Sequence, residues 1–294
     1  MGAWLHSSLP ALTEQQFVAW QQLIETRTGI DFSQHLPILQ GGLFRRLREL
    51  EHVDVDAYFK QVSKQPEGLH EWQRLLAHIA VKETSFFRQP AAFELVRKYL
   101  RKRVTQTQTL DVWSVGCATG EEPYSLAMIA SDVIEHSETQ PFLGVLATDM
   151  CTEALQLARG GCYREKRLEQ VPASFRRRFF TLDSEQWYRI KPELHQRICF
   201  AQANLLEVDR LPALPMDVIF CQNVLVYFRR GRTKQVLDAL VARLKPGGLL
   251  VLGPGEAAHW QHPAVTRTAH QGVSAWLHRA ENPVPQPISE GRKV

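Results

Sequence analysis

The chain has 294 residues and a formal net charge of +4, with 44% hydrophobic and 22% charged residues. This length is enough for one large domain or two smaller ones, and the composition excludes collagen, coiled-coil and low-complexity chains. No apolar run approaches the roughly 20 residues that span a bilayer, and the N-terminus lacks a basic region followed by an apolar stretch. We therefore expect a cytoplasmic protein without direct membrane insertion.

Cysteine spacing and charge distribution further narrow the classes of protein to which the chain could belong. The five cysteines include no C-x-x-C pair, so we expect free thiols rather than disulfides or a zinc site. Residues 1–81 and 82–150 each carry a net charge of −2, whereas residues 151–294 carry +8. Residues 159–200 alone contain 10 basic and 5 acidic residues. Such a local excess fits an acidic partner, a nucleic acid or simply a solvated face.

Residues 1–81 predict a helical domain. Thr13 and Gln16 form a capping box, and apolar residues then follow at helical spacing until Gly29. Two further helices are predicted from apolar stripes at Leu39, Leu43, Leu47 and Leu50, and at Leu69, Trp72, Leu75 and Ile79. We expect residues 82–109 to be a linker with a connecting helix that starts near Pro90.

From residue 110 to 280 the pattern predicts an α/β domain. Short apolar runs at 110–115, 142–149, 197–201, 216–221 and 248–253 alternate with helical stretches at 123–135, 151–158 and 231–244. This alternation is typical of a mostly parallel sheet with helices on both faces, and the run at 272–279 is expected to join it antiparallel. The Arg-rich stretch 159–196 is predicted to be an inserted subdomain, and residues 281–294 a disordered tail.

The loop after the first predicted strand is the most informative segment. Gly116 and Gly120 would let the backbone approach a ligand there, but the dinucleotide fingerprint G-x-G-x-x-G is absent. Glu121 and Glu122 stand at the helix N-terminus where a pyrophosphate would otherwise bind, and they suit a cation. Asp149 ends the second strand, where a carboxylate can accept both hydroxyls of a ribose. A ligand with a ribose, a positive charge and no phosphate is S-adenosylmethionine; the alternative is a plain strand–helix junction.

Five motifs in a fixed order make the chain resemble the CheR family of chemoreceptor glutamate methyltransferases over nearly its whole length. They are TSFFR at 84–88, GCATGEEPYS at 116–125, ATD at 147–149, NLLE at 204–207 and IFCQNVLVYF at 219–228. The resemblance implies a Rossmann-like class I methyltransferase sheet, a helical N-terminal domain and a small inserted β-subdomain at 159–196 that engages receptors.

The resemblance also implies a set of site residues. No metal site is expected, since His259 and His262 have no further ligand at suitable spacing except Glu256. The positions that would contact the cofactor are Thr84, Arg88, Glu122, Asp149, Asn204, Leu205, Cys221, Gln222 and Asn223. Arg88 and Tyr227 would lie closest to the reacting methyl group and are the predicted catalytic residues. The family often has Arg where Gln222 stands, so a contact made by that side chain would be weakened.

The predicted function is transfer of a methyl group from S-adenosylmethionine to glutamates on the cytoplasmic helical domain of a methyl-accepting chemoreceptor. A glutamate with a pKa of about 4.3 is ionised at neutral pH, so no general base is needed. Arg45, Arg46 and Arg48 face either an acidic receptor helix or solvent. The alternatives are a catalytically silent receptor-binding scaffold and a nucleic-acid methyltransferase. We expect a monomer, and no residue separates a swimming pathway from a pilus-linked one.

Overall fold

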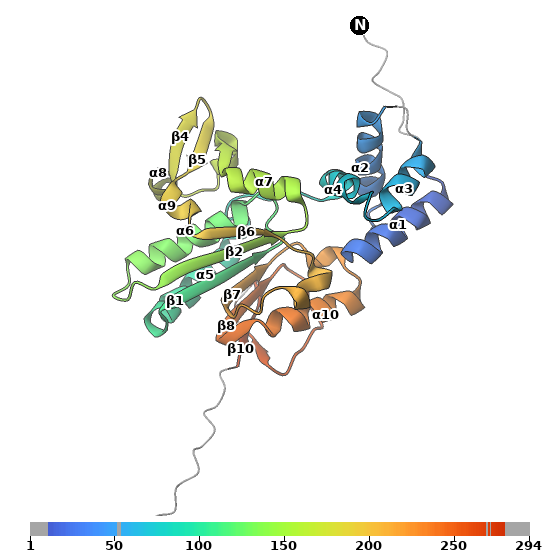
Figure 1. Cartoon of the computed structure of the whole chain (residues 1–294). Coiled ribbons are helices and arrows are strands. Elements are labelled where there is room, and N and C mark those ends of the chain that lie inside the picture. The colour runs from blue at the N-terminus through green and yellow to red at the C-terminus, as the bar shows by residue number, and fades with distance from the viewer. Residues whose placement is uncertain (1–10, 52–53, 269, 271, 280–294) are drawn as a thin grey trace, which may run out of the picture.

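The structure is a computed structural model that describes residues 11–51, 54–268, 270 and 272–279. The predicted tail, 281–294, lies outside the described residues. Figure 1 shows the N-terminal helices on one side of the molecule and the inserted small sheet on the other, with the main sheet between them. No helix in the described ranges is long and apolar enough to cross a bilayer.

Four helices form the N-terminal region: α1 (Glu14–Thr28), α2 (Leu36–Glu49), α3 (Val55–Ser63) and α4 (Leu69–Ile79). The predicted capping box at Thr13 is present, and Gly29 ends α1 in the left-handed conformation. Trp20, Ile24 and Leu75 are almost completely buried in the shared core of these helices. The sequence reading missed α3, whose N-terminus is capped by the Asp54 side chain.

One arginine of α2 is not available to a partner. Arg46 is buried and donates from Nε and Nη2 to the two carboxylate oxygens of Glu71 at 2.7 and 2.8 Å. The Tyr58 hydroxyl donates to the same carboxylate at 2.8 Å. Arg46 therefore holds the N-terminal helices together, and the expectation that it faces a receptor or solvent is wrong.

The main sheet has seven strands in the order β6-β2-β1-β7-β8-β10-β9. Their bounds are β1 (Thr109–Val115), β2 (Phe142–Asp149), β6 (Ile198–Gln202), β7 (Met216–Cys221), β8 (Leu244–Leu252), β9 (Val265–Arg267) and β10 (Ser274–His278). All pairs from β6 to β8 are parallel, and β10 pairs antiparallel with β8 and β9. The predicted α/β fold, including the antiparallel last strand, is confirmed. The three-residue strand β9 was too short to predict from its pattern.

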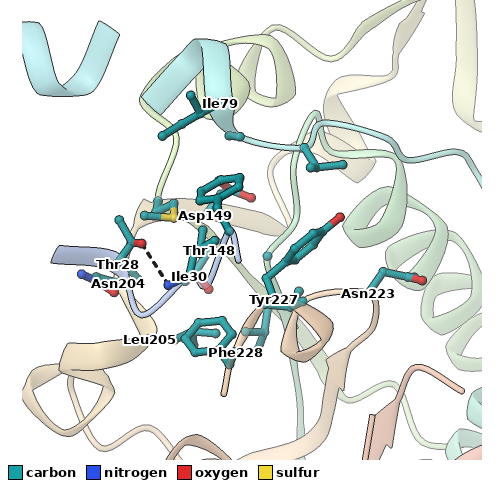
Figure 2. Close-up of a pocket in the computed structure, with 18 residues that line it drawn as sticks. Thr28, Ile30, Ile79, Thr148, Asp149, Asn204, Leu205, Asn223, Tyr227 and Phe228 are labelled. Carbon is teal, nitrogen blue, oxygen red and sulfur yellow. Dashed lines mark hydrogen bonds between the residues drawn. The ribbon is translucent and has the colours of Figure 1, made fainter. Parts of the chain in front are cut away.

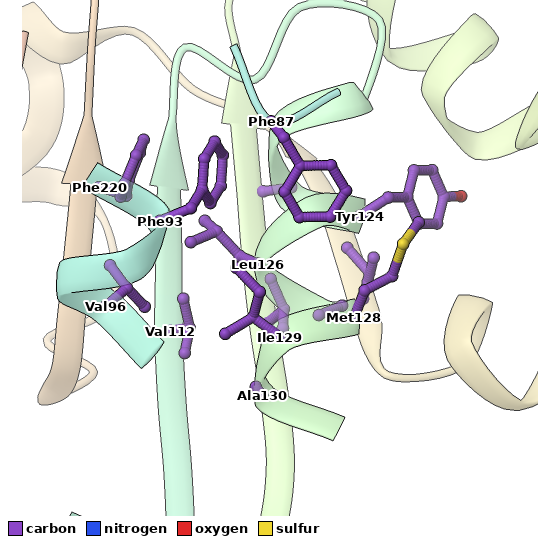
Figure 3. Packing of buried hydrophobic residues seen from close by; sticks show 14 of the residues in the cluster. Phe87, Phe93, Val96, Val112, Tyr124, Leu126, Met128, Ile129, Ala130 and Phe220 are labelled. Atoms are coloured by element: carbon purple, nitrogen blue, oxygen red, sulfur yellow. The ribbon is translucent and has the colours of Figure 1, made fainter. Parts of the chain in front are cut away.

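Helices cover both faces of this sheet. They are α5 (Pro90–Arg103), α6 (Glu121–Glu135), α7 (Thr152–Gly160) and α10 (Arg230–Val241). Short 3-10 turns lie in the connections at Val104–Gln106, Leu205–Arg210 (η3) and Leu225–Tyr227 (η4). Figure 3 shows side chains of α5 and α6, among them Phe93 and Leu126, meeting over Val112 of β1. Val236, Leu237 and Leu240 of α10 pack on the opposite face. Burial on both sides explains why the strands read as continuous apolar runs.

The insertion forms a second, three-stranded antiparallel sheet in the order β3-β5-β4, which confirms the predicted β-subdomain. Its elements are β3 (Cys162–Arg164), a 3-10 turn (Glu165–Leu168), α8 (Ala173–Phe179), β4 (Phe180–Ser184), β5 (Trp187–Ile190) and α9 (Pro192–His195). Phe86 packs edge-on against Tyr163 and Phe180, so the insertion shares the core of the main domain. The exact domain boundaries stay predictions.

Much of the basic character of the insertion is balanced within the chain. Arg167 pairs with Glu121, Arg176 with Glu165, Arg178 with Asp132 and Glu135, and Arg189 with Asp183. These pairs lower the charge that this region presents to a nucleic-acid backbone, which weakens the nucleic-acid interpretation.

Candidate functional site

Two adjoining pockets open at the carboxyl ends of β1, β2 and β7, where the strand order reverses and open α/β sheets bind ligands. The larger pocket is mainly apolar, and Figure 2 shows Tyr227 among its lining side chains. The smaller pocket is mainly polar and includes Thr84, Arg88 and Glu122. Both pockets are lined by Val81, Gly116 and Asn223, so they form one crevice with an apolar and a polar part.

The end of β1 requires glycine at position 116, because of its backbone conformation and its close approach to Val224. Its φ is +72°, and a Cβ added to it would lie 2.4 Å from Cγ2 of Val224. The amides of Gly116 and Cys117 both donate to the carbonyl of Thr148, at 2.8 and 2.9 Å. The β1–α6 loop is therefore fixed to the end of β2 with bare backbone facing the crevice.

Asp149 lies at the tip of β2, as predicted, and lines the larger pocket. Its carboxylate accepts hydrogen bonds from the amides of Ala118 and Cys151 at 2.9 and 2.8 Å. Burial raises the pKa of Asp149, although these two amides act in the opposite direction. The carboxylate is held rigidly and makes no ion pair among the described residues, so its remaining acceptor capacity points to a ligand with hydroxyl groups.

Glu121 and Glu122 have different roles, and only Glu122 faces the crevice. Glu121 is fully buried, accepts from Thr119 Oγ1 at 2.6 Å and pairs with Arg167 of the insertion. The expectation that both carboxylates line the site is therefore wrong for Glu121. Glu122 accepts from Ser114 Oγ at 2.7 Å and lines the polar pocket.

Burial raises the pKa of Glu122 to about 8. The Ser114 hydrogen bond and the charge of Arg88 oppose this rise, and the charge of Glu256 adds to it. A carboxyl group in this state gains most from a ligand that brings a positive charge, such as the ammonium group of an amino acid.

The remaining predicted cofactor residues divide into three groups. Asn204, Leu205 and Asn223 line the larger pocket, and Thr84, Gln222 and Asn223 the smaller one. The Gln222 side chain donates to the carbonyl of Leu252 at 3.1 Å, which ties it to the neighbouring strand. Cys221 is completely buried at the end of β7 and lines neither pocket, so the structure does not bring it together with the others.

The Asn204 side chain is already engaged. Its Oδ1 accepts from the amide of Leu206 at 3.0 Å, and its Nδ2 donates to the carbonyl of Arg27 at 2.7 Å. One N–H of the amide group is left for a ligand. Asn204 therefore joins the N-terminal helices to the crevice as well as lining it.

The two predicted catalytic residues lie on opposite parts of the crevice. Arg88 lines the polar pocket and donates from Nη1 to the carbonyl of Glu83 at 2.9 Å; among the described residues it makes no ion pair. Tyr227 lines the apolar pocket. Burial raises the pKa of Tyr227, and the positive charge of Arg88 opposes this, so the two groups lie within electrostatic reach.

The sequence reading missed two contributors to the site. Glu256 accepts hydrogen bonds from the amides of Val224, Leu225 and Gly253 at 2.8, 2.9 and 2.6 Å, and so shapes the turn after β7. The second contributor is a wall from the N-terminal helices, made by Thr28, Ile30, Phe32, Ile79 and Ala80. The apolar residues directly after Gly29 were a signal for this wall, whereas the spacing of Glu256 gave none.

The crevice fits S-adenosylmethionine. A carboxyl group without a cationic partner, Glu122, suits the ammonium group, and Asp149 suits the ribose hydroxyls. The apolar wall suits a heterocyclic base. Within the described residues, no cluster of three or more His, Cys, Asp or Glu side chains is placed to hold a metal.

Fold and crevice together define an S-adenosylmethionine-dependent methyltransferase with helices preceding its Rossmann-like sheet. Family models match both parts: the CheR methyltransferase all-alpha domain over residues 15–80, and the CheR methyltransferase SAM binding domain over residues 82–273. The chain belongs to the CheR methyltransferase family.

Named relatives agree with this assignment. Chemotaxis protein methyltransferase 2 of Pseudomonas aeruginosa is 33% identical over 83% of this chain and 87% of its own length. The chemotaxis protein methyltransferase of Escherichia coli is 35% identical over 84% of this chain and 85% of its own length. The probable biofilm formation methyltransferase WspC of Pseudomonas aeruginosa is 28% identical over 81% of this chain and 56% of its own length.

Proposed function

We propose that this chain methylates glutamate side chains on the cytoplasmic helical domain of a methyl-accepting chemoreceptor, giving glutamate methyl esters. The names of the relatives support a substrate in chemotaxis. The observation that carries the proposal is Arg88, a guanidinium at the crevice that makes no ion pair among the described residues. An unpaired guanidinium is suited to receive a carboxylate.

The cofactor would be held along the crevice. Glu122 would accept from its ammonium group, Asp149 from its ribose hydroxyls, and Thr84 would donate to its carboxylate. Asn204, Leu205 and Asn223 would contact the adenosine part. When bound, S-adenosylmethionine supplies an electrophilic methyl group on a sulfonium centre.

The acceptor places modest demands on the protein. A glutamate with a pKa of about 4.3 is ionised at neutral pH, so the site need not remove a proton. It has to align the carboxylate and exclude water, because the carboxylate loses its charge when the ester forms. Arg88 and the Tyr227 hydroxyl would orient the acceptor, and Val81, Ile30 and Phe32 would exclude water.

The test is transfer of a labelled methyl group to receptor-containing membranes. We expect label on the receptor that alkali releases as methanol, and no transfer to a receptor whose candidate glutamates are replaced by alanine. Base-stable label, or no label above background with every candidate receptor of the source organism, would contradict the proposal. Label on nucleic acid or on no substrate at all would favour one of the two alternatives.

Arg88→Ala should lower kcat about 100-fold, because a charge-assisted contact to the acceptor is lost. Arg88→Lys should restore part of the rate. Arg101→Ala, an exposed change in α5, the helix that follows Arg88 in the chain, is the matched control and should leave kcat unchanged. Calorimetry with S-adenosylhomocysteine separates the roles of Arg88: an unchanged Kd assigns it to the acceptor, and a weakened Kd assigns it to the cofactor carboxylate. A kcat equal to that of the wild type would remove Arg88 from the catalytic residues.

A further inference from the structure

The N-terminal helices are attached to the segment that carries Tyr227. Ile30, just after α1, forms an isolated antiparallel bridge with Phe228. The amide of Asp31 donates to the carbonyl of Tyr227 at 2.7 Å, and the His35 ring packs edge-on against the Tyr227 ring with centroids 5.5 Å apart. Residues 30–31 and 227–228 are therefore joined by a single β-bridge and one further backbone hydrogen bond; we call this pairing the latch.

The exposed side chain of Arg229 connects the two segments of the latch through ion pairs. Its guanidinium contacts Glu25 at 2.7 and 3.0 Å and Asp31 at 3.2 Å. Gln21 supports the same loop, since its Nε2 donates to Asp31 at 3.0 Å and its Oε1 accepts from the amide of Phe32 at 2.8 Å. The two-point contact with Glu25 fixes the direction of the Arg229 side chain as well as its charge.

The approach of the two segments is close enough to require glycine. Gly29 has a φ of +78°, and an added Cβ would lie 2.7 Å from Cε1 of Phe228 and 2.8 Å from Cδ2 of Leu206. The Thr28 hydroxyl accepts from the amide of Ile30 at 3.1 Å, drawn as a dashed line in Figure 2. The loop is therefore held firmly on the N-terminal side, so the latch can transmit a constraint to Tyr227.

Tyr227 is held from two directions. Glu256 fixes the amides of Val224 and Leu225 from inside the sheet domain, and the latch fixes the carbonyl of Tyr227 from the N-terminal helices. The side chain of Arg229 is 57% exposed, whereas that of Asp31 is 19% exposed. An exposed ion pair adds little to global stability, so its loss should affect local geometry more than folding.

From this arrangement we infer that Arg229 is a positioning residue for the proposed methyl transfer: it closes the latch and thereby holds Tyr227 in the crevice. The inference rests on the proposed function and adds a role for the N-terminal helices inside the reaction site. Arg229 touches neither pocket, so its effect on the reaction passes through Tyr227.

The test compares Arg229→Ala in two backgrounds of the full chain. In the wild-type background we expect kcat to fall about fivefold, a size typical of an exposed charge network. In the Tyr227→Phe background we expect no further fall, because the group that Arg229 positions is gone. Arg229→Lys should restore part of the rate, and Arg232→Ala, an exposed neighbour bonded only to Gln235 in the described residues, should leave kcat unchanged.

Hydrogen exchange gives a readout that does not need activity. The amide of Asp31 and the segment 224–229 should exchange faster in Arg229→Ala and at the wild-type rate in Arg232→Ala. Equal kcat for Arg229→Ala and wild type, or the same fivefold fall in both backgrounds, would overturn the inference. If the wild-type chain methylates no receptor, the proposed function fails, and hydrogen exchange then tests the latch alone. Faster exchange of the Asp31 amide and of 224–229 in Arg229→Ala would support the latch, and unchanged exchange would overturn it.

Discussion

The carboxylates at the two ends of the main sheet have different kinds of partner. At the amino end, Asp217 of β7 has a fully buried side chain and contacts Arg103 at 2.7 Å and Lys245 at 2.6 Å. Lys245 also contacts Asp111 at 2.7 Å. Burial alone would lower the pKa of Lys245, but its hydrogen bonds to Asp111 and Asp217 outweigh burial and raise the pKa. Each buried charge at this end is matched by a charge of the chain itself.

At the carboxyl end, the matching charges are missing. Glu122, Asp149 and Glu256 make no ion pair among the described residues, and burial raises the pKa of all three. Their partners are a hydroxyl and backbone amides. All three residues are partly buried, and a carboxylate taken out of water without a cationic partner is costly for folding. Perturbed pKa values gather at functional sites. The contrast indicates that the amino end stabilises the fold, whereas the carboxyl end is arranged for a ligand that brings a cation.

Removing the buried carboxylate at the amino end should have the largest effect, and that effect is on the free energy of unfolding. Among the residues that the structure describes, Asp217→Ala leaves Arg103 without an ion-pair partner and Lys245 with only Asp111, so the free energy of unfolding should fall by about 3 kcal/mol. Urea unfolding measures this change. The Kd for S-adenosylhomocysteine should change less than about twofold in the folded fraction.

Asp111→Asn is the control at the same cluster. The Asp111 side chain is 35% exposed, so its loss should lower the free energy of unfolding by about 1 kcal/mol at most. If Asp217→Ala weakened ligand binding as strongly as it lowered stability, the conclusion that the amino end stabilises the fold and the carboxyl end binds the ligand would be incorrect.

Breaking the carboxyl end should give the reverse pattern. Asp149→Ala removes the acceptor that we propose for the ribose hydroxyls, and the Kd for S-adenosylhomocysteine should rise about 100-fold. The amides of Ala118 and Cys151 lose their partner too, so Asp149→Asn, which keeps one carbonyl oxygen there, checks that the effect is not misfolding. Glu153→Ala, at an exposed carboxylate in the next helix, should leave the Kd unchanged. An unchanged Kd in Asp149→Ala would remove Asp149 from the site.

Much of the carboxyl end could be predicted from the sequence, because strand tips are readable from apolar runs. The run 142–149 ends at Asp149, and parallel strands bring that tip next to the loop after β1. The family motifs added Thr84 and Arg88, which no periodicity indicates.

Other parts of the site depend on packing that the sequence does not encode locally. Successive residues in a helix point about 100° apart, so periodicity alone cannot divide the pair Glu121-Glu122 into a structural and a ligand-facing member before the rotation of α6 is known. Only the family resemblance singled out Glu122. The latch joins segments about 200 residues apart in the chain, and the chain between Glu256 and the amides of Val224 and Leu225 includes α10 and β8. Cys221 illustrates the opposite case: it lies inside a family motif, yet its side chain is completely buried in the hydrophobic core.

Glu122 offers the subtlest test of the contrast, through pH. Its pKa of about 8 means that the carboxyl group is mostly protonated at pH 7, whereas an adjacent ammonium group favours the charged form. Binding of S-adenosylhomocysteine should therefore release a proton, and the Kd should fall as pH rises from 6 to 8 by at most about tenfold per unit. Calorimetry in two buffers of different ionisation enthalpy measures the released proton directly.

Glu122→Gln should remove the Glu122 share of this proton release and weaken binding at pH 8 about tenfold. Ligand-free stability provides an independent check on the sign. Because the folded pKa lies above the unfolded value, the contribution of Glu122 is complete below its unfolded pKa of about 4.5 and is lost as pH rises through about 8. The wild-type free energy of unfolding should thus decline between pH 5 and 8 more steeply than that of Glu122→Gln. If the unfolding free energies of the wild type and Glu122→Gln had the same slope against pH, Glu122 would be ionised in the empty crevice. The carboxyl end would then stabilise negative charge better than its contacts indicate.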